Sequence, residues 1–197
     1  MTELPEFQPF PKIARLSRDI IVTEKIDGTS AQIYVGEDGQ ILAASRNRWL
    51  TSRAVQAIRG CGEDNFGFAS WVEEHADDLC SLGPGRHYGE WWGSGIGRGY
   101  GLTKGEKRFS LFNVARWADE MGDPRSASRP KCCLTVPILY RGPFLTPRIE
   151  YCLEKLRDEG SVAAPGFMRP EGVVIFHPQG NVGFKKTLEK DAEGKGS

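Results

Sequence analysis

Short runs rich in β-branched and other apolar residues recur along the chain, and tight turns separate most of them. Two of these runs, at residues 30–35 and 40–45, flank an Asp38-Gly39 turn, which is a hairpin signal. The other runs lie at residues 20–26, 109–115, 133–139, 172–176 and 181–186. Strands joined by such short connections pair in an antiparallel manner. We therefore expect an α+β fold built mainly from antiparallel sheets with flanking helices.

Two segments have helical rather than strand periodicity. Between residues 68 and 80, apolar side chains recur at intervals of three and four, and Gly83 follows as a stop signal. A second helix is expected to start at Thr146-Pro147 and to end at Gly160, with Ile149 and further apolar residues on one face. Between these helices lies a glycine-rich stretch at residues 87–101, whose tryptophans fit either the core or a stacking surface.

The length and the composition favour one soluble domain. The chain has 197 residues, and its 26 basic residues balance 26 acidic ones. We expect a proline-punctuated arm at residues 1–19, one domain at 20–187 and a charged tail at 188–197. No apolar run is long enough for a membrane span, and no signal peptide or CxxC pair is present, so an intracellular, cytoplasmic protein with free thiols is expected. The zero net charge is a weak argument against a nucleic-acid partner, although basic residues outnumber acidic ones between residues 98 and 131.

Several common catalytic patterns are absent from the sequence. The glycine-rich stretch contains neither GxGxxG nor GxxxxGK[ST], and the chain has no GxSxG or HExxH. Its three histidines are far apart in sequence. We therefore expect neither a hydrolytic triad nor a zinc site.

Charged residues at strand ends are the remaining candidates for chemistry. Lys25, Asp27 and Gly28 form Lys-x-Asp-Gly after an apolar run, which fits either a nucleophilic lysine or a strand that simply ends in a turn. A lysine becomes nucleophilic only when it loses a proton, and nearby cations such as Lys185 and Lys186 favour that loss. Glu171 and Lys185 belong to successive strands, where they either face one cavity or form a structural ion pair.

Six motifs in order resemble those of the covalent nucleotidyltransferase superfamily, and most closely those of phage-type and editing-type RNA ligases. EKIDGTS (24–30) resembles the nucleophile motif, and AASRNR (43–48) resembles the Ser-Arg motif that follows it. The others are YGEWWGSGIGRGY (88–100), FSLFNV (109–114), EGVVIF (171–176) and GFKKT (183–187). The resemblance implies the ligase adenylation fold, ATP as the nucleotide, and Mg²⁺ or Mn²⁺.

The resemblance also implies a role for each motif residue. Lys25 would attack the α-phosphate of ATP and form lysyl-AMP, with Lys185 and Lys186 neutralising the phosphate. The AMP would pass to an RNA 5′-phosphate, and a 3′-hydroxyl would seal the strand, as in RNA repair. Glu171 would position the metal ion. The nucleotide would be held by Glu24, Asp27, Gly28, Arg46, Glu90 and Phe112.

Some positions depart from the family pattern. Ser30 stands where DNA ligases carry arginine, Asn113 replaces an aspartate, and Lys186 with Thr187 replaces the second part of Lys-x-Lys. Only 24 residues precede Lys25, which favours ATP over NAD. Few residues follow Lys186, so we expect self-adenylylation together with weak sealing, or sealing that needs a partner protein in place of a C-terminal domain.

Alternatives to an RNA ligase remain open. These are a capping-like guanylyltransferase, a DNA ligase-like enzyme acting on DNA or an RNA/DNA hybrid, an adenylyltransferase with another acceptor, and a non-catalytic nucleic-acid-binding module. Labelling with ATP and with GTP would separate the first from the others. Because a binding module would have little need of Lys25, Glu90, Glu171 and Lys185 together, their presence argues against the last.

Overall fold

Two twisted sheets form the centre of the molecule, which is described here by a computed structural model covering residues 6–59, 62–118 and 129–189. Sheet A has four strands in the order β7-β1-β8-β9, and sheet B has five in the order β3-β2-β4-β5-β6. Sheet A contains β1 (Asp19–Lys25), β7 (Ile138–Pro143), β8 (Gly172–His177) and β9 (Val182–Thr187). Sheet B contains β2 (Thr29–Val35), β3 (Ile41–Ser45), β4 (Gly85–Gly93), β5 (Lys107–Leu111) and β6 (Cys133–Thr135).

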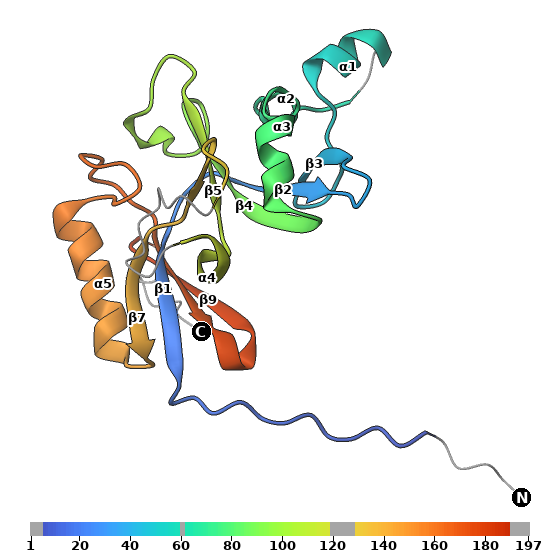
Figure 1. Cartoon of the computed structure of the whole chain (residues 1–197). Helices are drawn as coiled ribbons and strands as arrows, with labels where there is room; N and C mark the ends of the chain where they lie inside the picture. The colour runs from blue at the N-terminus through green and yellow to red at the C-terminus, as the bar shows by residue number, and fades with distance from the viewer. Residues whose placement is uncertain (1–5, 60–61, 119–128, 190–197) are drawn as a thin grey trace, which may run out of the picture.

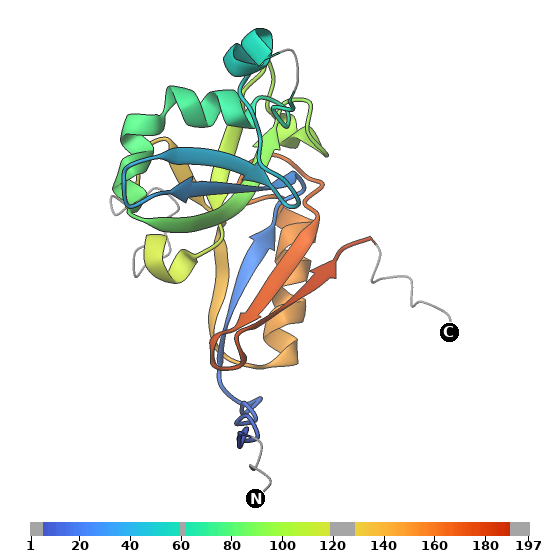
Figure 2. The ribbon, with the colours of Figure 1, turned by 90° about the vertical axis from the view of Figure 1, so that its right-hand side faces the viewer.

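Helices α2 (Phe68–Glu74) and α3 (Ala76–Leu79) cover one face of sheet B, and helix α5 (Thr146–Glu159) covers one face of sheet A (Figures 1 and 2). The other described α-helices are α1 (Arg53–Arg59) and α4 (Val114–Trp117). Apolar side chains of α2 and α3 pack on sheet B, and those of α5 pack on sheet A. A third cluster, which includes Ile26, Trp92 and Tyr100, lies between the sheets. This arrangement confirms the expected α+β fold with antiparallel sheets, since β5 and β6 alone among the described pairs run parallel.

The strand expectations are confirmed apart from three differences. The glycine-rich stretch contains β4, whose tryptophans are buried, so they belong to the core and not to a stacking surface. The run at 109–115 ends as a strand at Leu111 and turns into α4. The run at 133–139 divides into β6 and β7 in different sheets, because Pro137 between them has no N–H for a ladder.

The first helix is also shorter than expected, because it breaks at His75 into α2, α3 and a 3-10 turn at Cys80–Leu82. Helix α1 was not expected from the sequence. The described cysteines are free thiols, two of them buried. Residues 6–18 precede the first strand, while the ends of the expected arm and tail, 1–5 and 190–197, lie outside the described residues. Within the described chain, no helix has both the length and the hydropathy that a bilayer crossing needs.

Candidate active site

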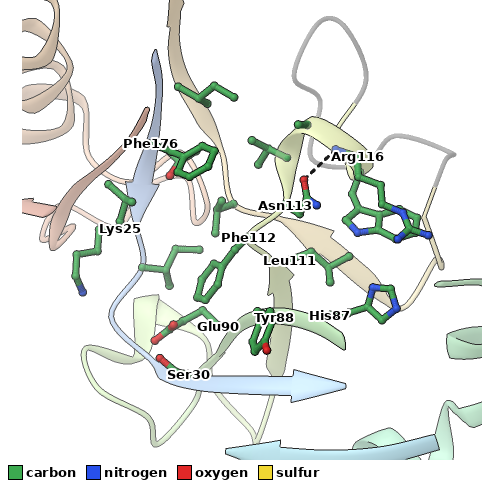
Figure 3. A pocket seen from close by; sticks show the side chains of 18 of the residues that line it. Lys25, Ser30, His87, Tyr88, Glu90, Leu111, Phe112, Asn113, Arg116 and Phe176 are labelled. Atoms are coloured by element: carbon green, nitrogen blue, oxygen red, sulfur yellow. Dashed lines mark hydrogen bonds between the residues drawn. The ribbon is translucent and has the colours of Figure 1, made fainter. Parts of the chain in front are cut away.

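A cavity of about 670 Å³ opens between the inner faces of the two sheets (Figure 3). Residues of β1 and β8 line it on one side, and residues of β2, β4 and the segment after β5 line it on the other. Lys25, Arg46, Glu90 and Phe112 are among its lining residues. The fold therefore gathers candidates from four separate sequence motifs around one space.

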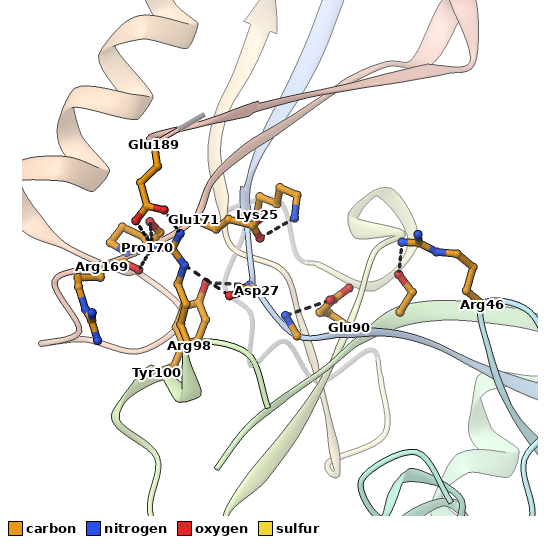
Figure 4. A network of polar contacts seen from close by, with 12 residues as sticks. Lys25, Asp27, Arg46, Glu90, Arg98, Tyr100, Arg169, Pro170, Glu171 and Glu189 are labelled. Atoms are coloured by element: carbon orange, nitrogen blue, oxygen red, sulfur yellow. Dashed lines mark hydrogen bonds and ion pairs between the residues drawn. The ribbon is translucent and has the colours of Figure 1, made fainter. Parts of the chain in front are cut away.

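Lys25 is the last residue of β1, and it makes the shortest polar contact at this cavity. Its Nζ donates a hydrogen bond to Glu171 Oε2 at 2.5 Å, as Figure 4 shows. In the sheet, Lys25 lies opposite Gly172, so Glu171 comes immediately before the paired part of β8. The side chains are 24% and 19% exposed, which makes this a partly shielded ion pair that a small charged ligand can reach.

The turn after Lys25 is held against β4 and the glycine-rich segment. The backbone N–H of Gly28 donates to Glu90 Oε1 at 3.1 Å. A Cβ atom on Gly28 would lie 2.5 Å from the carbonyl oxygen of Trp91, so this close approach requires glycine. The N–H of Asp27 donates to the Tyr100 hydroxyl at 2.9 Å, and its carboxylate lies 3.4 Å from Arg98 Nε. The Lys-x-Asp-Gly turn is thus fixed at both ends.

Glu90 is the most strongly perturbed carboxyl group at the cavity. It lies on β4 opposite Ser30 of β2. The pKa of Glu90 is raised to about 7, chiefly by burial and to a lesser extent by the negative charge of Glu171, while Lys25 and the Gly28 N–H oppose the shift. A carboxyl group with a pKa near neutral, beside a lysine, is typical of a functional site.

Arg46 and Phe112 approach the cavity from different strands of sheet B, since Arg46 follows β3 and Phe112 follows β5. The guanidinium of Arg46 donates to Ser30 Oγ at 3.0 Å, so Ser30 orients the arginine here. Phe112 follows β5, and its ring is 44% exposed in the cavity, where a flat ligand could lie against it (Figure 3). Asn113 has a local role, because its side chain caps α4 by accepting a hydrogen bond from the Arg116 N–H at 3.2 Å.

Glu24 lies beside Lys25 in sequence, but its carboxylate forms hydrogen bonds with the loop at residues 161–163. It accepts hydrogen bonds from Ser161 Oγ at 2.6 Å and from the N–H groups of Val162 and Ala163, both at 2.9 Å. The side chain is only 1% exposed, and burial raises the pKa of Glu24 despite these bonds. All three contacts tie β1 to the segment after α5, so they leave the carboxylate committed to the fold.

The two lysines of β9 point to opposite faces of sheet A. Lys185 lies opposite Val174, which lines the cavity, whereas Lys186 lies opposite Val173, which is buried against α5. Lys186 Nζ donates to Glu150 Oε1 of α5 at 2.5 Å. The structure therefore places Lys185 on the cavity side of the sheet, although not among the residues that line the cavity, and places Lys186 on the other side.

Arg98 and Tyr100 are neighbours of the site that sequence reasoning missed. Arg98 donates to both carboxylate oxygens of Glu189, at 2.9 and 2.8 Å, and to the carbonyl oxygen of Arg169 at 3.1 Å. These contacts join the glycine-rich segment to the end of β9 beside Asp27 (Figure 4). No periodicity marks either residue, since both belong to an irregular segment.

The carboxylates near Lys25 limit the kind of metal site that is possible there. In the part of the chain that the structure describes, no group of three or more His, Cys, Asp or Glu side chains is placed to hold a metal ion. Mg²⁺ commonly binds through one or two carboxylates together with water and substrate phosphates. The second oxygen of Glu171 fits that kind of shared site.

Comparisons with known proteins agree with this geometry. The sequence model of the RNA ligase family matches residues 18–190. The structure resembles a Naegleria gruberi RNA ligase variant without ligand (TM-score 0.60, 21% identity) and variants with AMP and Mn (0.61, 20%) or with ATP and Mn (0.56, 19%). Each match covers 90% of this chain and 51 to 52% of the other, so the chain spans about half the length of these relatives. No curated protein matches the sequence.

Proposed function

The chain belongs to the RNA ligase family, and from this premise we propose that it is an ATP-dependent RNA ligase that works through a covalent lysyl-AMP. The observation that carries the proposal is that Lys25 and Glu90 line one cavity between the sheets, with Glu171 paired to Lys25. Relatives with the same fold are described with ATP or AMP and Mn, which supports the choice of nucleotide.

In the first step, Lys25 is the nucleophile. Its ammonium group first gives a proton to water. The neutral Nζ then forms a bond to the α-phosphorus of ATP and gives a second proton to water, while the bond between the α-phosphorus and the bridging oxygen breaks. Pyrophosphate leaves with the electron pair of that bond. Glu171 Oε2 lies 2.5 Å from Nζ and holds it at the cavity before ATP binds.

The remaining residues would position the nucleotide and offset its charge. Phe112 would stack on the adenine, Arg46 and Glu90 would contact the ribose, and Lys185 would neutralise the α-phosphate. Asp27 and Gly28 would shape the turn that carries the nucleophile. We assign no direct nucleotide contact to Glu24 or Lys186, because their charged groups are engaged elsewhere in the fold.

A divalent ion, Mg²⁺ or Mn²⁺, would be held by Glu171 together with ATP phosphates and water. When bound, it supplies positive charge that offsets the charge on the reacting phosphates. Glu171 would exchange its contact with Lys25 for the ion, which frees Nζ to attack.

Sealing takes two further steps. The AMP would move from Lys25 to an RNA 5′-phosphate, and an RNA 3′-hydroxyl would then displace it. A partner protein that supplies further RNA contacts is proposed to make sealing efficient. RNA ends are the proposed substrate, with DNA and RNA/DNA hybrids as comparison substrates. Because ATP and RNA meet inside cells, the cytoplasm is the proposed location.

The test is incubation with α-labelled ATP or GTP and Mg²⁺, followed by denaturing electrophoresis. The wild-type protein and Lys155→Ala, an exposed lysine of α5, should take up label from ATP, and Lys25→Ala should not. Label that persists on Lys25→Ala, or never appears on the wild type, contradicts the mechanism. Preferential labelling by GTP would favour a capping-like enzyme instead. Pre-adenylylated RNA should bypass the first step, so any sealing should survive Lys25→Ala best with that substrate.

A further inference from the structure

One face of sheet B carries exposed aromatic rings beside an arginine. Tyr34 of β2 lies opposite Arg86 of β4, and Tyr88 follows Arg86 by two positions. Residues with this spacing share a face of the sheet. The residues that alternate with them on β2 are buried under α2 and α3, so this second face points away from those helices. Trp49, just after β3, joins it by contacting the ring of Tyr34 edge-on at 6.1 Å.

The aromatic rings hold the guanidinium of Arg86 in place. Its central carbon lies 5.3 Å from the ring centre of Tyr34 and 5.4 Å from that of Trp49. No described carboxylate forms an ion pair with Arg86. Trp49 is 52% exposed and Tyr88 is 53% exposed, so both rings offer free surface. Arg86 is therefore oriented by stacking and keeps N–H donors for an anion.

This surface continues into the cavity. Arg86 and Tyr88 belong to its lining, and Arg46 with Ser30 lies one row further along β2 towards Lys25. A ligand on the surface would thus reach the nucleophile without crossing a helix. Figure 3 shows Tyr88 beside Glu90 and Ser30 at this edge of the cavity.

We propose that Trp49, Tyr34, Arg86 and Tyr88, together called the aromatic platform, bind a single-stranded segment of the RNA substrate and lead its end into the cavity. The identity of the substrate rests on the proposed function. Unpaired bases stack on aromatic rings, and arginine contacts the phosphates between them. Bases in a duplex are already stacked on each other, so the platform favours a single strand.

Charge complementarity supports an RNA strand on this face. The basic segment at residues 98–131 is the other candidate for binding the RNA backbone, but its described arginines have partners within the protein. Arg98 pairs with Glu189, Arg108 pairs with Glu106, and Arg116 lies over Trp117. Arg86 instead stacks on exposed rings beside the cavity, which favours a polyanion with flat bases over an apolar protein partner.

The experiment measures binding of a fluorescent single-stranded 12-mer RNA with a 5′-hydroxyl by anisotropy, so that no ligation occurs. Trp49→Ala should raise the Kd at least about fivefold, and Trp49→Phe should keep it within about twofold, because phenylalanine also stacks. Tyr151→Ala removes an equally exposed ring from α5 and should have no effect. Arg86→Ala should reduce the slope of log Kd against the logarithm of the salt concentration by about one, as expected for the loss of one phosphate contact. A blunt duplex of the same sequence should bind at least about fivefold more weakly.

One further variant and a second readout keep the outcomes distinct. Trp49→Leu retains apolar contact with Tyr34 without a flat ring, so it replaces Trp49→Ala if that protein does not fold. Trp49 lies outside the cavity lining, and self-adenylylation of its variants should stay within about twofold of wild type. Wild-type affinity in the Trp49 variants, or equal binding of the duplex, overturns the platform. Absence of lysyl-AMP together with Trp49-dependent RNA binding overturns the proposed function and leaves the platform standing.

Discussion

Glu171 Oε2 and Lys25 Nζ lie 2.5 Å apart although the two residues are 146 positions apart in sequence. Pairing of β1 with β8 creates this contact, since Lys25 lies opposite Gly172. One carboxylate therefore holds the proposed nucleophile and is also the proposed metal ligand. The two proposed roles are connected, because an ion bound to Glu171 would compete with Lys25 for the charge of the same carboxylate.

Glu171→Gln should slow self-adenylylation about 10- to 100-fold, because the amide keeps the shape of glutamate but loses the charge that attracts the ion. The Mg²⁺ concentration for half-maximal rate should rise as well. Both values come from initial rates of lysyl-AMP formation at graded Mg²⁺.

A matched control is Glu150→Gln, which breaks the other 2.5 Å lysine contact, on the face of sheet A that packs against α5. This variant should keep the rate and the Mg²⁺ dependence within about twofold. If the two variants lose the same amount of activity, then the loss of any glutamate–lysine ion pair lowers the rate, and the position of Glu171 beside the cavity has no special importance.

Lys185→Ala and Lys186→Ala should differ sharply in self-adenylylation. Lys185 is on the cavity side of sheet A, so its loss should slow the reaction about 100-fold, which is typical when a charge-stabilising donor is removed. Lys186→Ala should stay within about threefold, since its ammonium contacts Glu150. Single-turnover rates at saturating ATP measure both, and a larger loss in Lys186→Ala would reverse the assignment.

The opposite orientations of Lys185 and Lys186 show which part of the site could be predicted from the sequence and which could not. Alternation predicts that neighbouring residues of a strand face opposite ways, but it does not say which of them meets the cavity. Packing of Val173 against α5 decides that Lys186 faces outward. Glu24 is a similar case, because its partners at residues 161–163 are distant in sequence and come close only after folding.

The glycine-rich stretch was hard to interpret for a different reason. Because glycine weakens a strand, the local sequence preferences of this stretch do not predict strand β4. Pairing with β2 on one side and β5 on the other stabilises β4 nevertheless. At Gly89, a Cβ would lie 2.5 Å from the Ser110 carbonyl oxygen, so glycine is needed for packing there. In contrast, the hairpin at Asp38-Gly39 and helix α5 follow directly from turn chemistry and 3.6-residue periodicity.

Glu24→Ala should lower the free energy of unfolding by about 2–4 kcal/mol, because it leaves the N–H groups of Val162 and Ala163 and the buried Ser161 hydroxyl without their acceptor. Glu24→Gln keeps an oxygen for the two N–H groups and should cost about 1 kcal/mol or less. Urea unfolding at pH 7 measures both. If Glu24→Gln instead leaves stability unchanged but weakens ATP binding, the carboxylate contacts the nucleotide after all.

Glu90→Gln should stabilise the protein at pH 8 and not at pH 5. The pKa of Glu90 is about 7 in the folded state, against an ordinary value of 4.5, chiefly because of burial. The folded state therefore binds more protons than the unfolded chain between these values, and wild-type stability falls as the pH rises through this range. A glutamine can still accept the Gly28 N–H bond without carrying a buried charge. Urea unfolding should show the advantage of Glu90→Gln growing by about 1–3 kcal/mol from pH 5 to pH 8, and a constant difference would contradict the raised pKa.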